Sequence, residues 1–149
     1  MFEHRFVAGW GDMDFNAHMR NTAYLDRGAD TRMLFFAAHG FPMAEFKRRA
    51  IGPVVMRDEI DYRAEIGLLE GFIATLALAG LADDGSRFVM HNEFTRDDGK
   101  LAVRLRSTGG WLDLRERRLI APPPELFDAL QQLARTADFS TLPGSVRSA

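Results

Sequence analysis

The chain has 149 residues, a length that suits one domain and is long enough to bury a hydrophobic core without covalent cross-links. Its formal net charge of −2 removes one argument for nucleic acid, because domains that bind phosphate backbones usually carry a basic excess. The sequence contains no cysteine, which excludes disulfides, thiolate zinc sites, iron–sulfur clusters and a cysteine nucleophile.

Neither a targeting segment nor a membrane span is predicted. The N-terminal residues lack the long apolar core of a signal peptide. No apolar run approaches the roughly 20 residues that a membrane-spanning helix requires. We therefore expect a cytoplasmic protein that binds neither membranes nor nucleic acid.

The N-terminal part of the chain predicts a strand, a polar turn and one long helix. Aromatic and β-branched residues predict the strand over residues 2–10, and the polar turn follows over residues 11–18. From about 21 to 39, apolar residues recur in steps of four, four and three, which predicts a helix that ends at Gly40. Because this helix is apolar over much of its circumference, we expect it to be buried on several sides. Gly28, in its middle, indicates either the close approach of another backbone or a tolerated glycine.

The rest of the chain predicts a short helix over residues 43–49 and then strands joined by tight turns. Turn signals such as Asp97-Asp98-Gly99 separate four strands, which span residues 54–64, 72–81, 87–95 and 101–114. A terminal amphipathic helix is expected from 125 to about 135. The small, polar tail from about residue 138 is expected to be loosely ordered.

This order of elements predicts an α+β fold with a single domain over residues 1–149. A five-stranded antiparallel sheet must wrap around one long central helix, with a further helix at the C-terminus. A sheet curled in this way leaves an open edge, and such edges are usually blunted or paired. We therefore expect at least a symmetric homodimer, in which two copies extend one sheet.

The polar turn and the start of the long helix form the candidate site. Asp12, Asp14 and His18 crowd into the turn, and a helix begins with unpaired backbone N–H groups and partial positive charge. An acid seven residues before Asn21 can face those donors, which gives acyl transfer a nucleophile or base and an oxyanion site. Turn-forming acids and an N-capping asparagine explain the same residues without catalysis. A metal site built from the two acids and the histidine lacks a fourth protein ligand.

The run GDMDFNAHMRNTAY, residues 11–24, resembles the signature of hotdog-fold thioesterases of the 4-hydroxybenzoyl-CoA thioesterase-like family. That signature is Asp-x-Asp-x-x-Gly-His, followed by Asn and Tyr at the spacings seen here. Ile60-Asp61-Tyr62 resembles the second-strand pattern of the family, and the resemblance covers about residues 3–115. It implies a hotdog fold, a homodimer or homotetramer, and hydrolysis of an acyl-CoA thioester without metal or cofactor, coenzyme A being part of the substrate.

The resemblance also implies roles for residues of the motif. Carried over by position, Asp14 resembles the family's catalytic aspartate, which acts as nucleophile or general base. The backbone N–H of Asn21 resembles the oxyanion donor, and His18 resembles a position that shapes the pocket. Asn16 and Tyr24 belong to the same motif, and we expect them to contact the substrate.

Two positions depart from the family pattern. Ala17 stands where the family usually has glycine, so the turn is expected to be slightly reshaped. Ala29 stands where many members have a glutamate on the helix, so a mechanism that uses that glutamate has no counterpart here.

Polar residues on two strands are further candidates. Asp58 has the same parity as Met56 and Ile60 and is expected to face the helix. There it could bind substrate in the pocket of a partner subunit, or act as a structural device that fixes the strand register. Arg104 and Arg106 alternate outward on the last long strand, where they could meet CoA phosphates or form an ordinary solvated face.

Two other functions stay open at this point. A hotdog hydratase or dehydratase carries the signature Asp-x-Asn-Pro-x-His, and residues 14–18, DFNAH, lack the proline and place the histidine one residue early. A non-catalytic acyl-CoA-binding protein is the second alternative. The chain carries no attached DNA-binding segment, which counts against a regulator.

Overall fold

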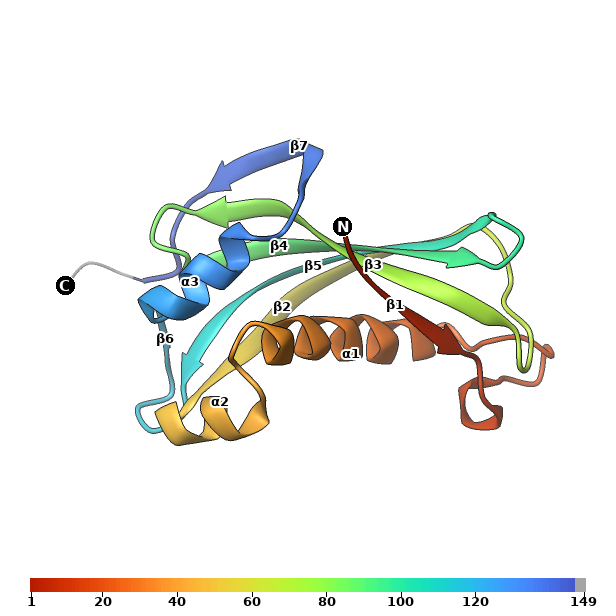
Figure 1. Cartoon of the computed structure of the whole chain (residues 1–149), viewed down its shortest axis with the longest axis horizontal. Coiled ribbons are helices and arrows are strands. Elements are labelled where there is room, and N and C mark those ends of the chain that lie inside the picture. The colour runs from red at the N-terminus through yellow and green to blue at the C-terminus, as the bar shows by residue number, and fades with distance from the viewer. Residues whose placement is uncertain (147–149) are drawn as a thin grey trace.

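A computed structural model describes residues 1–146, in which one sheet arches over a long helix (Figure 1). A short 3-10 helix at Trp10–Asp12 precedes the first of three α-helices. The helices are α1 (Ala23–Ala38), α2 (Met43–Arg49) and α3 (Pro124–Gln131). The strands are β1 (Phe2–Val7), β2 (Ile51–Tyr62), β3 (Gly71–Ala82), β4 (Arg87–Arg96), β5 (Leu101–Asp113), β6 (Arg118–Ile120) and β7 (Arg135–Leu142).

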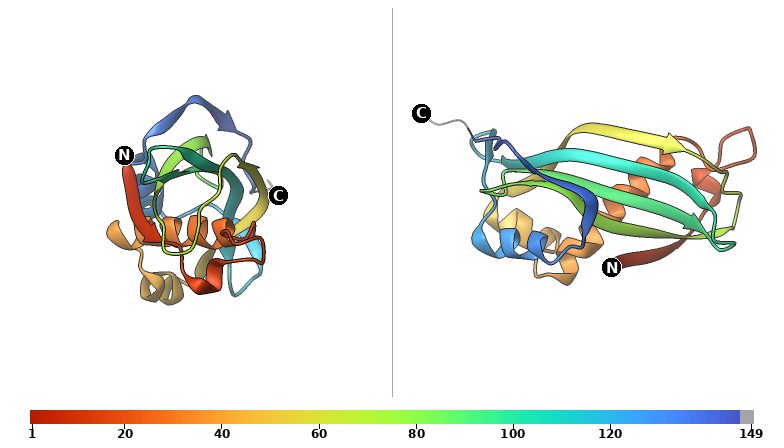
Figure 2. Two further views of the ribbon diagram at one scale, coloured as in Figure 1. Left: turned by 90° about the vertical axis from the view of Figure 1, so that its right-hand side faces the viewer. Right: turned by 90° about the horizontal axis from the view of Figure 1, so that it is seen from above.

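The sheet has the strand order β1-β3-β4-β5-β2, and each neighbouring pair on this path is antiparallel. All three α-helices lie on one side of this sheet, and β7 lies on the other (Figures 1 and 2). The predicted hotdog arrangement, an antiparallel sheet wrapped around one central helix, is confirmed. The strand count differs, because β6 adds to β5 and β7 adds to β3.

The C-terminal segment is more ordered than the sequence predicts. The chain leaves α3 at Gln131, earlier than the predicted residue 135, and Leu78 donates its backbone N–H to the Ala134 carbonyl. Residues 138–142, which we expected to be loosely ordered, belong to β7, and residues 140–142 pair in parallel with β3. Residues 147–149 of the predicted loose tail lie outside the described residues.

Near the N-terminus, local hydrogen bonds place the end of the first strand and the start of the long helix at other residues than the sequence predicts. The first strand ends at Val7 instead of residue 10, because the Asp12 carboxylate accepts from the Gly9 N–H and bends the chain into the 3-10 helix. The long helix begins at Ala23 instead of residue 21, after a turn in which Ala23 donates to the Arg20 carbonyl.

Two buried clusters fill the space between the helices and the sheet. One surrounds the C-terminal half of α1 and includes Phe36, Phe46 and Trp111, which come from α1, α2 and β5. The other lies beside the first turn of α1 and includes Tyr24 and Phe94. Burial of such large side chains contributes much of the stability of a domain of this size.

Gly28 allows α1 to lie close to the sheet. A Cβ atom built on Gly28 would lie 2.6 Å from Leu105 Cδ2 and 3.2 Å from Asn92 Oδ1. The close approach that the glycine indicated is therefore present, and the neighbouring groups are side chains of β4 and β5 rather than another backbone.

The strand β2 forms one end of the five-strand path and pairs with β5 alone among the described residues. Its register shifts between Val55 and Arg57, which makes Met56 an extra, bulged residue. Asp58 faces α1 as predicted: Ser107 donates to Asp58 Oδ1 at 2.6 Å, and Arg32 of α1 donates to Ser107 at 3.1 Å.

Candidate functional site

A tight turn presents Asp14. The Asp14 backbone N–H donates to the His18 carbonyl at 2.9 Å, and Met13 and Met19 form an antiparallel bridge at its base. The Asn16 N–H donates to Asp14 Oδ1 at 2.9 Å, which fixes the rotamer of the acid. Ala17 adopts a φ of 65°, the left-handed region, where the family pattern has glycine. An L-residue with this φ carries local strain.

Asp12 has a different role from Asp14. Its carboxylate accepts from the Gly9 N–H at 2.9 Å and from Arg27 of α1 at 2.8 Å, and only 12% of its side chain is exposed. Burial favours a higher pKa for Asp12, but the Gly9 hydrogen bond and the Arg27 guanidinium outweigh it and lower the pKa. Asp12 therefore fastens the turn to the helix.

The metal alternative receives no support from this geometry. Asp12 is occupied by Arg27 and Gly9, so the two acids of the turn do not converge on one point. Across residues 1–146, no three histidine or acidic side chains gather closely enough to hold a metal ion.

Beside the turn lies a cavity of about 520 Å³, which we call the Asp14 cavity. Its walls bring together the predicted site residues of the turn and the helix start with the end of β2 and the residues that follow it. The lining residues are Asp14, Asn16, His18, Met19, Asn21, Tyr24, Tyr62, Arg63, Ala64 and Glu65. Asp58, which was predicted to contact the substrate, does not line this cavity, because its side chain is bound to Ser107 of β5.

Asp14 and His18 stand side by side at the mouth of the cavity. His18 Nδ1 lies 3.5 Å from Asp14 Oδ2, and the side chains are 29% and 28% exposed. His18 Nδ1 also lies 3.0 Å from the Met19 carbonyl, which only a protonated Nδ1 can satisfy as a hydrogen bond. The Met19 carbonyl, with a smaller contribution from the Asp14 charge, raises the pKa of His18 despite its partial desolvation. An imidazole held in this way keeps an N–H next to the carboxylate.

The start of α1 offers free backbone donors. Thr22, the N-cap residue, makes no side-chain capping bond. Ala23 and Leu25 donate to Arg20 and Thr22, but across residues 1–146 the backbone N–H groups of Asn21, Thr22 and Tyr24 have no hydrogen-bond acceptor. Unpaired N–H groups at a helix start, with the positive end of the helix dipole behind them, attract an anion or a developing oxyanion.

Two tyrosines form the aromatic wall of the cavity. Tyr24 is 2% exposed and packs edge-to-face against Tyr62 and Phe94, with ring centroids 5.8 and 5.6 Å away. Burial raises the pKa of Tyr24 to about 12, so its hydroxyl stays protonated. Tyr62 donates its hydroxyl to the Asn21 carbonyl at 2.8 Å. Sequence reasoning gave Tyr62 no role in the site, although its parity with Ile60 already put it on the helix-facing side of β2.

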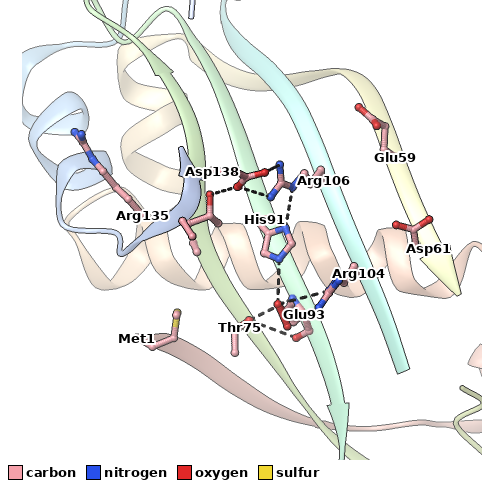
Figure 3. Close-up of a pocket in the computed structure, with 13 residues that line it drawn as sticks. Met1, Glu59, Asp61, Thr75, His91, Glu93, Arg104, Arg106, Arg135 and Asp138 are labelled. Carbon is pink, nitrogen blue, oxygen red and sulfur yellow. Dashed lines mark hydrogen bonds and ion pairs between the residues drawn. The ribbon is translucent and has the colours of Figure 1, made fainter. Parts of the chain in front are cut away.

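A second cavity, of about 590 Å³, lies on the face of the sheet turned away from α1 (Figure 3). Arg106 makes two 2.8 Å hydrogen bonds to Asp138 of β7 and donates to His91 Nδ1 at 3.1 Å, and His91 Nε2 lies 3.3 Å from Glu93. Arg106, which faces outward as predicted, thus holds β7 against the sheet. Its charge is neutralised by Asp138, a partner within the chain.

An antiparallel sheet around one helix, with an acid-bearing turn at the helix start, defines the class of protein. The chain belongs to the thioesterase-like superfamily, whose family model matches residues 8–130. The family resemblance of the motif in residues 11–24 is thereby confirmed. Among curated proteins, none matches the sequence at a significant level.

Solved structures share this fold at low sequence identity. The hypothetical protein SAV2348 from Staphylococcus aureus, solved in complex with CoA, is 22% identical with a TM-score of 0.81, over 99% of this chain and 94% of that one. Slr0204, a 1,4-dihydroxy-2-naphthoyl-CoA thioesterase from Synechocystis, is 14% identical with a TM-score of 0.79, over 89% and 96%. A DHNA-CoA thioesterase from Staphylococcus aureus is 16% identical with a TM-score of 0.79, over 87% and 88%. Within residues 1–146, no helix has the length and apolar character needed to cross a bilayer.

Proposed function

We propose that this protein hydrolyses an acyl-CoA thioester to a carboxylic acid and free CoA. The observation that carries the proposal is that Asp14 lines one cavity with Asn21 and Tyr24, two residues at the start of α1 whose backbone N–H groups have no acceptor within residues 1–146. Membership of the thioesterase-like superfamily supports the reaction class. The likeness to a fold solved with CoA and to two thioesterases of an aryl-CoA supports CoA as the thiol part of the substrate.

In the proposed mechanism, the thioester carbonyl oxygen points toward the N–H of Asn21 and its neighbours. Asp14 either attacks the carbonyl carbon or takes a proton from a water molecule that attacks it. The C–S bond then breaks and CoA leaves as a thiolate. If Asp14 is the nucleophile, water hydrolyses the acyl-aspartyl anhydride in a second step. Because a thiolate is a good leaving group, no strong general acid is required.

The other cavity residues would bind and orient the substrate. His18 would keep an N–H beside the Asp14 carboxylate, and the Asn16 N–H already holds one of its oxygens. Tyr24 would contact the acyl group from the cavity wall. We expect no metal and no separate cofactor, and we propose a cytoplasmic homodimer or homotetramer. Asp58 would have a structural role, in which it accepts the hydrogen bond of Ser107, the side chain that Arg32 binds. It would contact the substrate only if a partner subunit extends the cavity to it.

The test is a thiol-release assay over short, long and aromatic acyl-CoAs. Asp14→Asn keeps the size and hydrogen-bond acceptor of the side chain but cannot act as base or nucleophile, so turnover should fall by about 1,000-fold or more. Asp26→Asn is the matched control, because Asp26 is an acid on the exposed side of α1 and lies outside the cavity. An unchanged melting temperature shows that Asp14→Asn is folded. Wild-type turnover in this variant would remove Asp14 from the mechanism.

Two results would replace the proposed reaction by another. Loss of the conjugated double-bond absorbance of an enoyl-CoA, without thiol release, would identify a hydratase. Tight binding of acyl-CoA with no thiol release and no hydration would identify a binding protein. No thiol release from any member of the panel would contradict the thioesterase proposal directly.

A further inference from the structure

We infer that Arg63 binds an anionic oxygen group of the substrate, which is either a phosphate of CoA or a carboxylate on the acyl group. This inference rests on the proposed thioesterase function and deepens it. Arg63 directly follows β2, and among the described residues that line the Asp14 cavity it is the one arginine or lysine. The guanidinium fork of an arginine can bind either kind of anion through two parallel hydrogen bonds.

A β-bulge at the end of β2 explains why Arg63 lies at this cavity. Glu59 and Asp61 line the cavity on the outer face of the sheet (Figure 3), and strict alternation would place Arg63 on that face too. The backbone N–H groups of Arg63 and Ala64 both donate to the Ala102 carbonyl, at 2.7 and 3.0 Å. Two residues opposite one form a bulge, which bends the strand and re-aims a side chain. Arg63 accordingly lines the Asp14 cavity, on the α1 side of the sheet.

The segment that carries Arg63 is tied to the rest of the site at both ends. On one side, the Tyr62 hydroxyl donates to the Asn21 carbonyl at 2.8 Å. On the other side, the Met19 N–H donates to the Ile66 carbonyl at 2.7 Å. These bonds fix the backbone from which the arginine side chain extends, so an anion that binds there does not have to order a loop.

The side chain of Arg63 is unpaired, unlike those of other arginines near the site. Arg27 is bound to Asp12, and Arg96 is bound to Asp98. The Arg63 side chain makes no hydrogen bond and no ion pair with another group of residues 1–146. Its guanidinium therefore keeps all of its donors for a ligand.

The charge balance of the cavity gives this arginine a function. The other charged side chains of the lining are the acids Asp14 and Glu65, with His18 beside Asp14. A CoA thioester carries negative phosphates, which both acids repel. An unpaired guanidinium offsets that repulsion at one place and so fixes where an anionic group lies. We therefore expect the substrate to bind with its thioester at Asp14 and a negative group at Arg63.

The test compares Arg63→Gln with Arg118→Gln. Arg118 of β6 is exposed, pairs with Glu116 and lies outside the Asp14 cavity, so this control removes the same charge from another place. With the acyl-CoA that the wild-type protein hydrolyses, Arg63→Gln should raise KM about 10-fold or more and change kcat less than about twofold. Arg63→Lys keeps the charge but not the fork and should recover part of the loss, and Arg118→Gln should behave as wild type.

Two substrate series identify the anion. If it is a phosphate, Arg63→Gln should raise KM for every acyl-CoA but not for the same acyl group on pantetheine, which has no phosphate. If it is a carboxylate, KM should rise only for acyl groups that carry one, on CoA and on pantetheine alike. A KM within about twofold of wild type in both series, or a loss confined to kcat, would overturn the inference.

A second readout needs no turnover. Thioethers of CoA and of pantetheine, with and without a carboxylate on the alkyl group, are not hydrolysed, and calorimetry gives their Kd. Arg63→Gln should weaken the binding of the thioethers that carry the recognised anion about 10-fold or more. Equal binding by wild type and Arg63→Gln, or no binding by wild type, would overturn the inference. A wild-type protein that binds these probes but hydrolyses no acyl-CoA would overturn only the proposed function.

Discussion

Replacing Ala17 with glycine should stabilise the protein. Ala17 has a φ of 65°, and an L-residue in the left-handed region costs about 1–2 kcal/mol relative to an unstrained conformation. Glycine relieves that strain but loses more backbone entropy on folding, an opposing effect of about 0.5–1 kcal/mol. The net gain is about 0.5–1 kcal/mol. For a domain of this size, that raises the melting temperature by about 1–4 °C.

The measurement is urea unfolding, with calorimetry for the melting temperature. The urea midpoint should rise for Ala17→Gly with an unchanged slope. Ala29→Gly is the matched control, because the same substitution inside α1 should destabilise by about 0.5–1 kcal/mol or more. Ala50, with a φ of 53° after α2, should repeat the gain. The strain argument is wrong if Ala17→Gly is neutral or destabilising while Ala29→Gly loses stability as expected.

Two further substitutions test the packing of α1 and the anchoring of the turn. Gly28→Ala should destabilise by about 1 kcal/mol in urea unfolding, because the clash with Leu105 costs about 1–3 kcal/mol and the gain in helix propensity returns about 1; a stabilised variant would mean that Leu105 moves aside freely. Asp12→Asn should destabilise by about 1–3 kcal/mol at pH 7, since it removes the charge bound to Arg27. The folded pKa of Asp12 is lowered, so its contribution is present above the unfolded pKa near 3.8 and is lost as pH falls through the lower folded pKa. The melting temperatures of wild type and Asp12→Asn should therefore converge below about pH 3.8, and a constant difference down to pH 2 would contradict this role.

Local signals in the sequence predicted most of the fold. The helical period gave the long buried helix, and alternation with turn signals gave the four long strands from β2 to β5. The strand β7 was not predicted, because its pairing with β3 is non-local and its sequence, RTADFSTL, is mostly polar like that of an exposed loop. Arg106 binds Asp138 across 32 positions, a contact that no local pattern contains.

The candidate site could be predicted in part, because the motif is contiguous. Asp14, His18 and Asn21 lie within eight positions of one another, and a single turn brings them to one cavity. Tyr62 lies 41 positions from Asn21, and alternation alone gives the face of its side chain but not the reach of its hydroxyl. Asp58 shows the opposite case: its orientation was predicted correctly, but its hydrogen bond to Ser107 keeps it away from the cavity.

The anchoring of the acid-bearing turn decides which parts of the protein move together. Asp12 is bound to Arg27, and Arg20 donates its backbone N–H to the Asp12 carbonyl at 2.7 Å, so the turn and the first turns of α1 form one mechanical unit. The acid and the helix-end donors sit on that unit, and residues 62–65 form the opposite wall from a different part of the chain. In the proposed reaction, substitutions at residues 63–65 of that wall can therefore change the size of the acyl group that fits while the spacing between Asp14 and the donors stays the same.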